Sequence, residues 1–218
     1  IPFNGILEND LYGWTRDPAA EDYSAVYSKW WSVQTSVKKF DPFQPPDIFV
    51  KYRQNTGNYA LSRDLGNNSD LKEWTINGNI NFEKNYSNED DNLTEKGNGG
   101  SFIEVLDKHG KIISRWFPHI DYKSQIISIY FNNQIVIKKP KTSLDDLLNK
   151  FQSFSIHASK GNILFQYGPY SKTTGIFDPS SDWRAPKTLR FYFWANGRNY
   201  DRIVDLDALR FRSFNQPL

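Results

Sequence analysis

Short segments in which apolar and polar residues alternate dominate this chain. Alternation with a period of two places every second side chain on the same face of an extended strand. Most of the segments are rich in β-branched and aromatic residues and are bounded by Asn, Gly, Asp or Pro. They are residues 49–53, 74–83, 125–131, 134–138, 154–158, 162–167, 188–195, 202–206 and 209–214. Such a series predicts an all-β protein built as a two-sheet antiparallel sandwich.

The stretch 97–118, GNGGSFIEVLDKHGKIISRWFP, shows this pattern around a tight turn. Ile103 and Val105 alternate with Glu104, and the turn 108–110 ends in a glycine, which adopts positive φ without strain. The glycine-rich start enters a strand rather than a helix, so it offers no helix N-terminus to a phosphate. We therefore expect a framework hairpin of the sandwich wall rather than a catalytic loop.

One segment departs from the strand pattern. In TSLDDLLNKFQSF the apolar residues Leu144, Leu147, Leu148 and Phe151 recur at helical spacing. A Thr or Ser precedes them and can serve as an N-cap, and two aspartates in the first turn suit the helix dipole. The sequence predicts one short surface helix near 143–151, at one end of the sandwich.

The chain length of 218 residues is enough for one large β domain or two small ones. We expect a single domain over 1–218, with an irregular, aromatic-rich N-terminal arm over about 1–65. No initiator methionine begins the chain, so we expect a processed or excised part of a larger polypeptide. Cysteine is absent, which excludes disulfides, thiolate metal sites and cysteine nucleophiles. The net charge of +2 favours neither nucleic acid nor an anionic membrane as a partner, and no apolar run suits membrane insertion.

The segment from Trp74 to Phe214 resembles a known family through four stretches: WTINGNINFE, GGSFIEVLDKHGKII, FSIHASKGNILFQYG and PKTLRFYFWANGRNYDRIVDLDALRF. The family is the lectin/glucanase-type β-sandwich of the concanavalin A-like group. The end segments NGILENDLYGWT and DRIVDLDALRF are similar to the first and last strands of jelly-roll carbohydrate-binding modules. The resemblance implies a jelly-roll sandwich that binds saccharides. Modules of this kind also occur in phage tails and baseplates.

Carboxylates offer little support for catalysis. Glycoside hydrolysis requires two of them across the sugar, and the glucanases of this group carry a Glu-x-Asp-x-Glu run that this sequence lacks. Glu104 and Asp107 have the wrong spacing to share a strand face, whereas Asp205 and Asp207 have the right one. We name no catalytic residue and favour a non-enzymatic role. A hydrolase or lyase of the same fold that uses Glu104 or the aspartate pairs is the alternative.

The three histidines are dispersed along the chain, so the sequence lacks the closely spaced histidines of a transition-metal site. Calcium prefers oxygen ligands, which are abundant. By resemblance to jelly-roll modules, Asp205 and Asp207 would lie near Glu8 or Asp10 at a structural calcium position. The alternative is an ordinary pair of terminal strands, and we name no other cofactor.

Aromatic residues make up 16% of the chain, more than a core of this size needs. Aromatic rings can cover the apolar face of a sugar while polar side chains bind its hydroxyl groups. Three neighbouring segments, 165–175, 175–186 and 193–202, combine the two kinds of residue, and their loops can meet at one rim of the sandwich. The predicted ligand-binding residues are Tyr167, Tyr170, Asp182, Trp183, Arg184, Asn196, Arg198 and Tyr200. Trp74 and Trp194 are expected in the core, and Trp116 as a cap on the hairpin.

The leading hypothesis is a non-catalytic carbohydrate-binding sandwich that recognises a polysaccharide or glycan. We expect it outside the cell, on a cell surface or on a virion, where other protein modules of a larger assembly are further candidate partners. Besides the enzyme, a structural or adhesive assembly domain, such as part of a phage baseplate, is the remaining alternative. In that case the exposed aromatic residues would contact protein.

Overall fold

The computed structural model describes residues 14–16, 31–35, 48–54, 57–83, 98–121, 124–148, 150–196 and 200–214. The strands of the first half are β1 (Trp14–Arg16), β2 (Trp31–Thr35), β3 (Ile48–Gln54), β4 (Gly57–Asp64), β5 (Glu73–Glu83), β6 (Asn98–Asp107) and β7 (Ile112–Asp121). Those of the second half are β8 (Ile126–Phe131), β9 (Gln134–Pro140), β10 (Gln152–Ser159), β11 (Asn162–Tyr167), β12 (Tyr170–Thr174), β13 (Pro186–Asn196) and β14 (Tyr200–Phe214).

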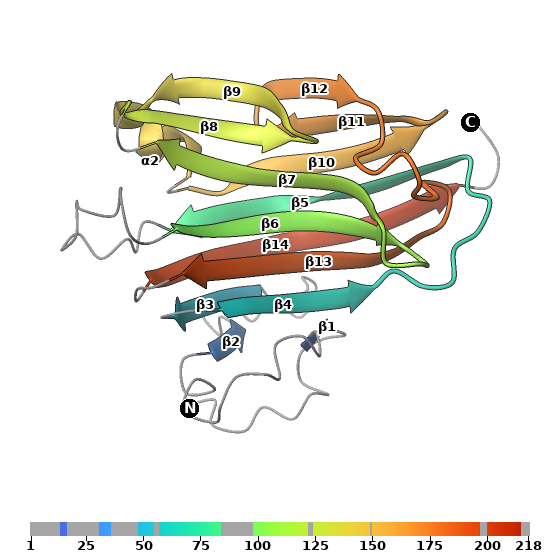
Figure 1. The fold of residues 1–218 in the computed structure, drawn as a ribbon, viewed down its shortest axis with the longest axis horizontal. Coiled ribbons are helices and arrows are strands. Elements are labelled where there is room, and N and C mark those ends of the chain that lie inside the picture. Colours follow the sequence, from blue (N-terminus) through green and yellow to red (C-terminus); the bar gives the residue numbers. More distant parts are fainter. Residues whose placement is uncertain are drawn as a thin grey trace.

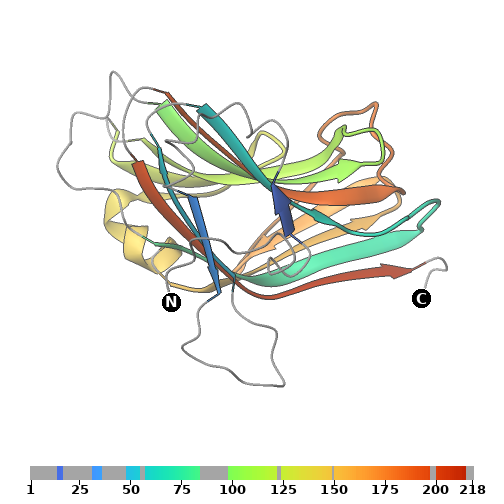
Figure 2. The ribbon, with the colours of Figure 1, turned by 90° about the horizontal axis from the view of Figure 1, so that it is seen from below.

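Two antiparallel sheets form the protein, as the sequence predicted (Figure 1). Sheet A has the strand order β1-β4-β13-β6-β7-β8-β9, and sheet B has the order β12-β11-β10-β5-β14-β3-β2. Figure 2 shows the sheets as two stacked layers whose strands bend along their length. Non-sequential neighbours such as β13 and β6 make this a jelly-roll-type sandwich. The expected N-terminal arm contributes β1 to β4 to the two sheets; its residues 1–13, 17–30, 36–47 and 55–56 lie outside the described part.

The predicted hairpin is confirmed. Strands β6 and β7 pair antiparallel around the turn, with Ile103 opposite Trp116 and Glu104 opposite Arg115. Gly110 has a φ of 75°, the left-handed conformation that the turn requires and that glycine adopts without strain.

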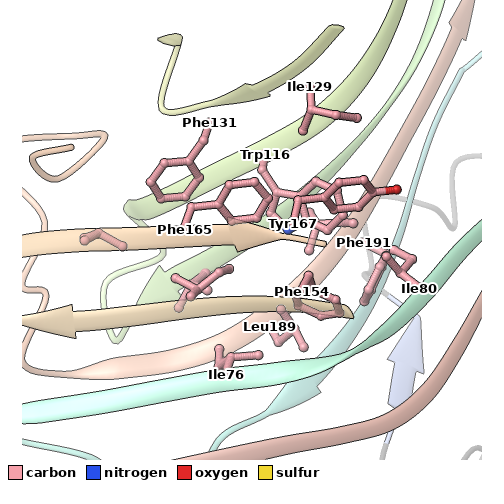
Figure 3. Close-up of a cluster of buried hydrophobic side chains, with 14 of the residues drawn as sticks. Ile76, Ile80, Trp116, Ile129, Phe131, Phe154, Phe165, Tyr167, Leu189 and Phe191 are labelled. Atoms are coloured by element: carbon pink, nitrogen blue, oxygen red, sulfur yellow. The ribbon is translucent and has the colours of Figure 1, made fainter. Parts of the chain in front are cut away.

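The core lies between the sheets and is rich in aromatic rings (Figure 3). Trp116 is at its centre, with ring centroids 5.1 Å from Phe165, 5.5 Å from Phe154 and 5.5 Å from Tyr167. The expectation that Trp116 caps the hairpin is wrong, because the residue is 0% exposed. Trp74 is in the core as predicted, and the side chain of Trp194 lies outside the described part.

The predicted surface helix is present but shorter than expected. A 3₁₀ turn, η5 (Lys141–Ser143), leads into the four-residue helix α2 (Leu144–Leu147). The carbonyl of Leu148 accepts a hydrogen bond from the N–H of Phe82 in β5, so the chain has already left the helix there. Phe151 is therefore not on a helix and is 49% exposed. In the part of the chain that the structure describes, no helix has the length and apolarity to cross a membrane.

Candidate functional site

The outer face of sheet A, which points away from sheet B, carries a connected group of polar and aromatic side chains. Ile103 of β6 and Phe191 of β13 are buried in the core. Strand alternation therefore directs their neighbours Phe102 and Tyr192 to the outer face. The same reasoning applies in β7 and β8, where Trp116, Ile129 and Phe131 are buried between the sheets.

Four aromatic rings cross this face in a row, which we call the aromatic row: Tyr192, Phe102, Phe117 and Tyr130. Tyr192 stacks on Phe102 with a centroid distance of 6.1 Å, and Phe102 meets Phe117 edge-to-face at 5.0 Å. Phe117 stacks on Tyr130 at 5.1 Å, and the ring of His119 lies 6.0 Å from that of Tyr130. The row crosses four adjacent strands, roughly 14 Å at the usual spacing between strands. All four residues of the row are half-buried, and His119 is exposed.

Beside the aromatic row, one carboxylate holds two arginines. One oxygen of Glu104 accepts a hydrogen bond from Nε of Arg115 at 2.6 Å, and the other accepts one from Nε of Arg190 at 2.7 Å. The Nη2 atoms of Arg115 and Arg190 contact the same two oxygens at 2.5 and 2.6 Å. The Glu104 side chain is 0% exposed, whereas those of the arginines are 25% and 22% exposed. We call this group the arginine clamp; two cations and one anion give it a net charge of +1.

The arginine clamp and the aromatic row form one surface. The guanidinium of Arg115 lies 4.6 Å from the centroid of Phe102 and 4.9 Å from that of Phe177. The guanidinium of Arg190 lies 5.4 Å from the ring of Tyr192. Cation–π contacts of this kind stabilise both partners and restrict the rotation of the long arginine side chains. The charges of this surface are therefore held in place before any ligand arrives.

This geometry argues against Glu104 as a catalytic carboxylate. A general acid or base must reach a substrate proton within hydrogen-bond distance. Both oxygens of Glu104 are occupied by guanidinium groups, and the side chain is fully covered. Its role in this arrangement is to position Arg115 and Arg190.

Tyr167, one of the predicted ligand-binding residues, belongs to the core. It is 1% exposed, and its hydroxyl donates a hydrogen bond to the carbonyl of Leu147 at 2.6 Å. Burial raises the pKa of this phenol well above its ordinary value. Tyr167 therefore offers no surface to a ligand, and the prediction that it lies at an exposed rim is wrong.

The three predicted segments do not meet at one rim. Trp183 lies beside Gly161, in the turn before β11, at 3.8 Å from where a Cβ on that glycine would be. Tyr170 follows the other end of β11, which is about 17 Å away along the strand. Asn196 ends β13, ten residues and roughly 33 Å beyond Pro186, where that strand begins next to the Trp183 segment.

The segment 175–186 is held by structural contacts. Trp183 is half-buried against the core, and its carbonyl accepts a hydrogen bond from Nε1 of Trp74 at 2.6 Å. Arg184 forms long ion pairs with Asp70 at 3.6 Å and Asp182 at 3.5 Å. Tyr170, on the edge strand β12, is half-buried against the core and lies 5.9 Å from the ammonium of Lys139. A ligand contact at Tyr170, Asp182, Trp183 or Arg184 stays a prediction.

Asp107 ties the predicted hairpin to that segment. Its carboxylate accepts hydrogen bonds from the backbone N–H groups of His109, Lys111 and Asp182 at 2.8 to 2.9 Å. Burial alone would raise the pKa of Asp107. The hydrogen bonds from Asp182, Lys111 and His109 outweigh burial and lower it. Asp107 is therefore a structural carboxylate that orders two loops.

Several predicted residues lie outside the described part. Arg198, Glu8 and Asp10 are not described at all, and the side chains of Asn196, Tyr200, Asp205 and Asp207 are not described. The backbones of Asp205 and Asp207 pair with Asn81 and Asn79 in β14 and β5. Among the residues that are described, no group of three or more His, Cys, Asp or Glu side chains could hold a metal ion. The calcium site at Asp205 and Asp207 stays a prediction.

The residues of the aromatic row were not identified from the sequence. Within each strand a signal was present, since Tyr130 alternates with the apolar residues Ile127, Ile129 and Phe131. Within 175–186 the side chain that reaches the outer face of sheet A is Phe177, which was not singled out. What the sequence did not supply was the order of the strands.

No protein-family model and no curated protein matches this sequence. Similar solved structures include the CBM2 module of the evolved Dit of Lactobacillus casei BL23 phage J-1, with 13% identity, a TM-score of 0.51 and coverage of 94% of this chain and 92% of that one. They also include the family 7 alginate lyase A1-II′ in complex with substrate, in a variant in which one histidine and one tyrosine are replaced. This chain shares 10% identity with it, with a TM-score of 0.50 and coverage of 96% of both chains. The chain spans 18% of the length of a sialidase that it matches with a TM-score of 0.48. At such identities the likeness establishes the jelly-roll sandwich fold alone.

Proposed function

We propose that this domain is a non-catalytic carbohydrate-binding module that holds a polysaccharide on the outer face of sheet A. The observation that carries the proposal is the continuity of the aromatic row with the arginine clamp. Apolar ring surfaces would pack on the C–H faces of sugar rings. The tyrosine hydroxyls, His119 and the guanidinium groups would bind the sugar hydroxyls.

The charge of the arginine clamp favours an acidic polysaccharide. Its net charge of +1 lies directly against the aromatic row, while the charge of the whole chain is close to neutral. A carboxylate on the sugar can accept paired N–H groups of a guanidinium, the strong form of this hydrogen bond. The alginate lyase bound to its substrate and the phage CBM2 module support a saccharide as the ligand class for this fold.

An array of glycans and cell-wall polysaccharides, probed with calcium and again with chelator, tests the proposal. Any ligand found is then titrated against Tyr130→Ala and Phe117→Ala, with Phe151→Ala as the matched control. Phe151 is an equally large, exposed aromatic residue that is not part of the row. Loss of one ring contact of about 1–1.5 kcal/mol weakens binding roughly tenfold.

Binding that is intact in Phe151→Ala and weakened in both row variants would support the proposal, provided that thermal unfolding shows all three to be folded. No ligand on the array for the folded domain, or equal affinity in all variants, would contradict it. Binding of a protein partner that requires the aromatic row and that no sugar competes away would instead favour the adhesive assembly domain.

A polysaccharide lyase is the second candidate, because His119 and Tyr130 lie side by side on the same face. In an elimination, a base removes the proton next to the sugar carboxylate, the C–O bond to the neighbouring sugar breaks and a C=C bond forms. The leaving oxygen takes up a proton. His119 would act as the base and Tyr130 as the proton donor, with Arg115 binding the carboxylate. Release of unsaturated product from alginate, measured by ultraviolet absorbance and abolished in His119→Ala, would favour this reaction; no absorbance change in the native domain would exclude it for that polymer.

We further propose a calcium site, additional ligand contacts and a location for the domain. A structural calcium ion at Asp205 and Asp207 would raise the unfolding temperature in calcium relative to chelator. Trp183 and Arg184 near one end of β11, and Tyr170 about 17 Å away past its other end, would each offer a separate further contact to a long polymer. We place the domain outside the cell, on a cell surface or on a virion, as one module of a larger assembly, where several weak sites would act together.

A further inference from the structure

The outer face of sheet B, on the opposite side of the molecule, contains a polar hollow of about 300 Å³. Four adjacent strands line it, in the order β11, β10, β5 and β14. Its polar lining side chains are Gln166, Ser153, Ser155, Asn77, Asn79 and Arg210. Strand β10 contributes the short serine side chains, and its neighbours β11, β5 and β14 contribute the longer amide and guanidinium side chains. Phe154 contributes only its backbone, because its ring is in the core.

A β-bulge in β14 directs Arg210 to this hollow. Asp207 pairs with Asn79 and Arg210 with Asn77, so β14 advances three residues while β5 advances two. The extra residue reverses the alternation of the strand. Leu209 and Phe211 then pack against the core, and Arg210 lies on the outer face. Bulges that reorient one side chain are common next to binding sites.

The lining groups can both donate and accept hydrogen bonds. Ser155 donates to the amide oxygen of Gln166 at 2.9 Å, which leaves the Gln166 NH₂ group to act as a donor. The Asn77 amide offers one further donor group and one acceptor, and the hydroxyl of Ser153 offers both. Arg210 is exposed, and no described carboxylate forms an ion pair with it.

We propose that this hollow is a second binding site, which takes a single hydroxylated carboxylate such as a sugar acid. The guanidinium of Arg210 binds the carboxylate, and the amides of Asn77 and Gln166 bind the hydroxyls. Among the described residues that line the hollow, none contributes an aromatic ring to it, so binding depends on hydrogen bonds and charge and is weak. The site is independent of the aromatic row and would exist even if the row bound nothing.

Titration of the ¹⁵N-labelled domain with sodium glucuronate tests this site, because amide NH₂ groups of Asn and Gln side chains give separate nuclear magnetic resonance signals. We expect saturable shifts of the Asn77 and Gln166 side-chain signals. Arg210→Ala should reduce the affinity at least fivefold. Arg212→Ala should leave it within twofold, since Arg212 is an exposed arginine on the same strand that does not line the hollow.

Three comparisons complete the experiment. Tyr130→Ala should leave the affinity unchanged, which separates this site from the aromatic row. Gln166→Ala should also weaken binding, because it removes a hydrogen bond to a ligand hydroxyl and leaves the Arg210 contact with the carboxylate intact. Absence of shifts at Asn77 and Gln166, equal loss in Arg210→Ala and Arg212→Ala, or equal binding of neutral methyl glucoside would each overturn the proposal.

Discussion

Replacement of Glu104 by Gln tests the arginine clamp most directly. The substitution preserves the shape of the side chain and removes its charge, so that two guanidinium groups face each other without an anion between them. Removal of one partner from a buried ion pair costs about 3–5 kcal/mol. Arg115 and Arg190 are about one-quarter exposed and can turn partly toward water, which places the expected loss near the lower limit, about 3 kcal/mol.

Urea unfolding of the native domain and Glu104→Gln measures this loss as a fall in the free energy of unfolding. Arg184→Ala is the matched control, because it removes a surface arginine with ion pairs of 3.5 and 3.6 Å. Exposed pairs of that kind contribute about 0–1 kcal/mol. A double-mutant cycle between Glu104→Gln and Arg115→Gln should give a coupling energy in the range of about 0.5–3 kcal/mol.

A loss of less than about 1 kcal/mol in Glu104→Gln, or no more than in Arg184→Ala, would refute the reasoning. It would mean that solvent already screens the three charges and that the clamp does not hold its arginines in place. The variant also bears on function. If the clamp presents Arg115 and Arg190 to a ligand, Glu104→Gln should weaken polysaccharide binding.

Three further predictions each concern one side chain and its hydrogen bonds. Tyr167→Phe leaves the Leu147 carbonyl without its buried donor, so it should lower the free energy of unfolding by about 1–3 kcal/mol without affecting glycan affinity; reduced affinity in a fully folded variant would contradict this. Asp107→Asn should cost about 1–3 kcal/mol at neutral pH. Folding lowers the pKa of Asp107, so its contribution to the free energy of unfolding is fully present above the unfolded-state pKa of about 3.9. That contribution is lost as the pH falls through the folded-state pKa. Unfolding curves of the native domain and of Asp107→Asn should therefore converge only below about pH 4. Asn132→Gly keeps the positive φ of the β8–β9 turn but removes three side-chain hydrogen bonds: one accepted from the Arg115 N–H and two donated to the Thr174 hydroxyl and the Gly175 carbonyl. Thermal unfolding should therefore show a loss of about 1 kcal/mol or more.

The sandwich could be predicted because alternation is a property of each strand by itself. The segment 97–118 contains the alternating residues and the Gly110 turn of the β6–β7 hairpin, so its sequence was sufficient to predict its structure. The helix near 143–151 shows the limit of the same approach. Its apolar spacing continues to Phe151, but the carbonyl of Leu148 is bonded to Phe82, more than sixty residues away in the sequence, and this tertiary contact ends the helix.

The candidate site could not be predicted in the same way, because it depends on which strands are neighbours. Tyr192 and Phe102 are paired in adjacent strands although the sequence separates them by 192 − 102 = 90 residues. Nearness in the sequence suggested instead that the segments 165–175, 175–186 and 193–202 share a rim. The 11-residue antiparallel strand β13 carries the chain roughly 33 Å from Pro186 to Asn196, so segments at its two ends cannot share a site.

The two tyrosines Tyr167 and Tyr130 show what strand parity alone can decide. Tyr167 has the same parity as Ile163 and Phe165, so all three point to one face, and that face is the core. Tyr130 has the opposite parity to its buried neighbours and points outward. Parity within a strand therefore separates a structural tyrosine from a candidate ligand contact. It does not reveal that Tyr130 lies next to Phe117 and His119, and only this arrangement of neighbours makes Tyr130 part of a binding surface.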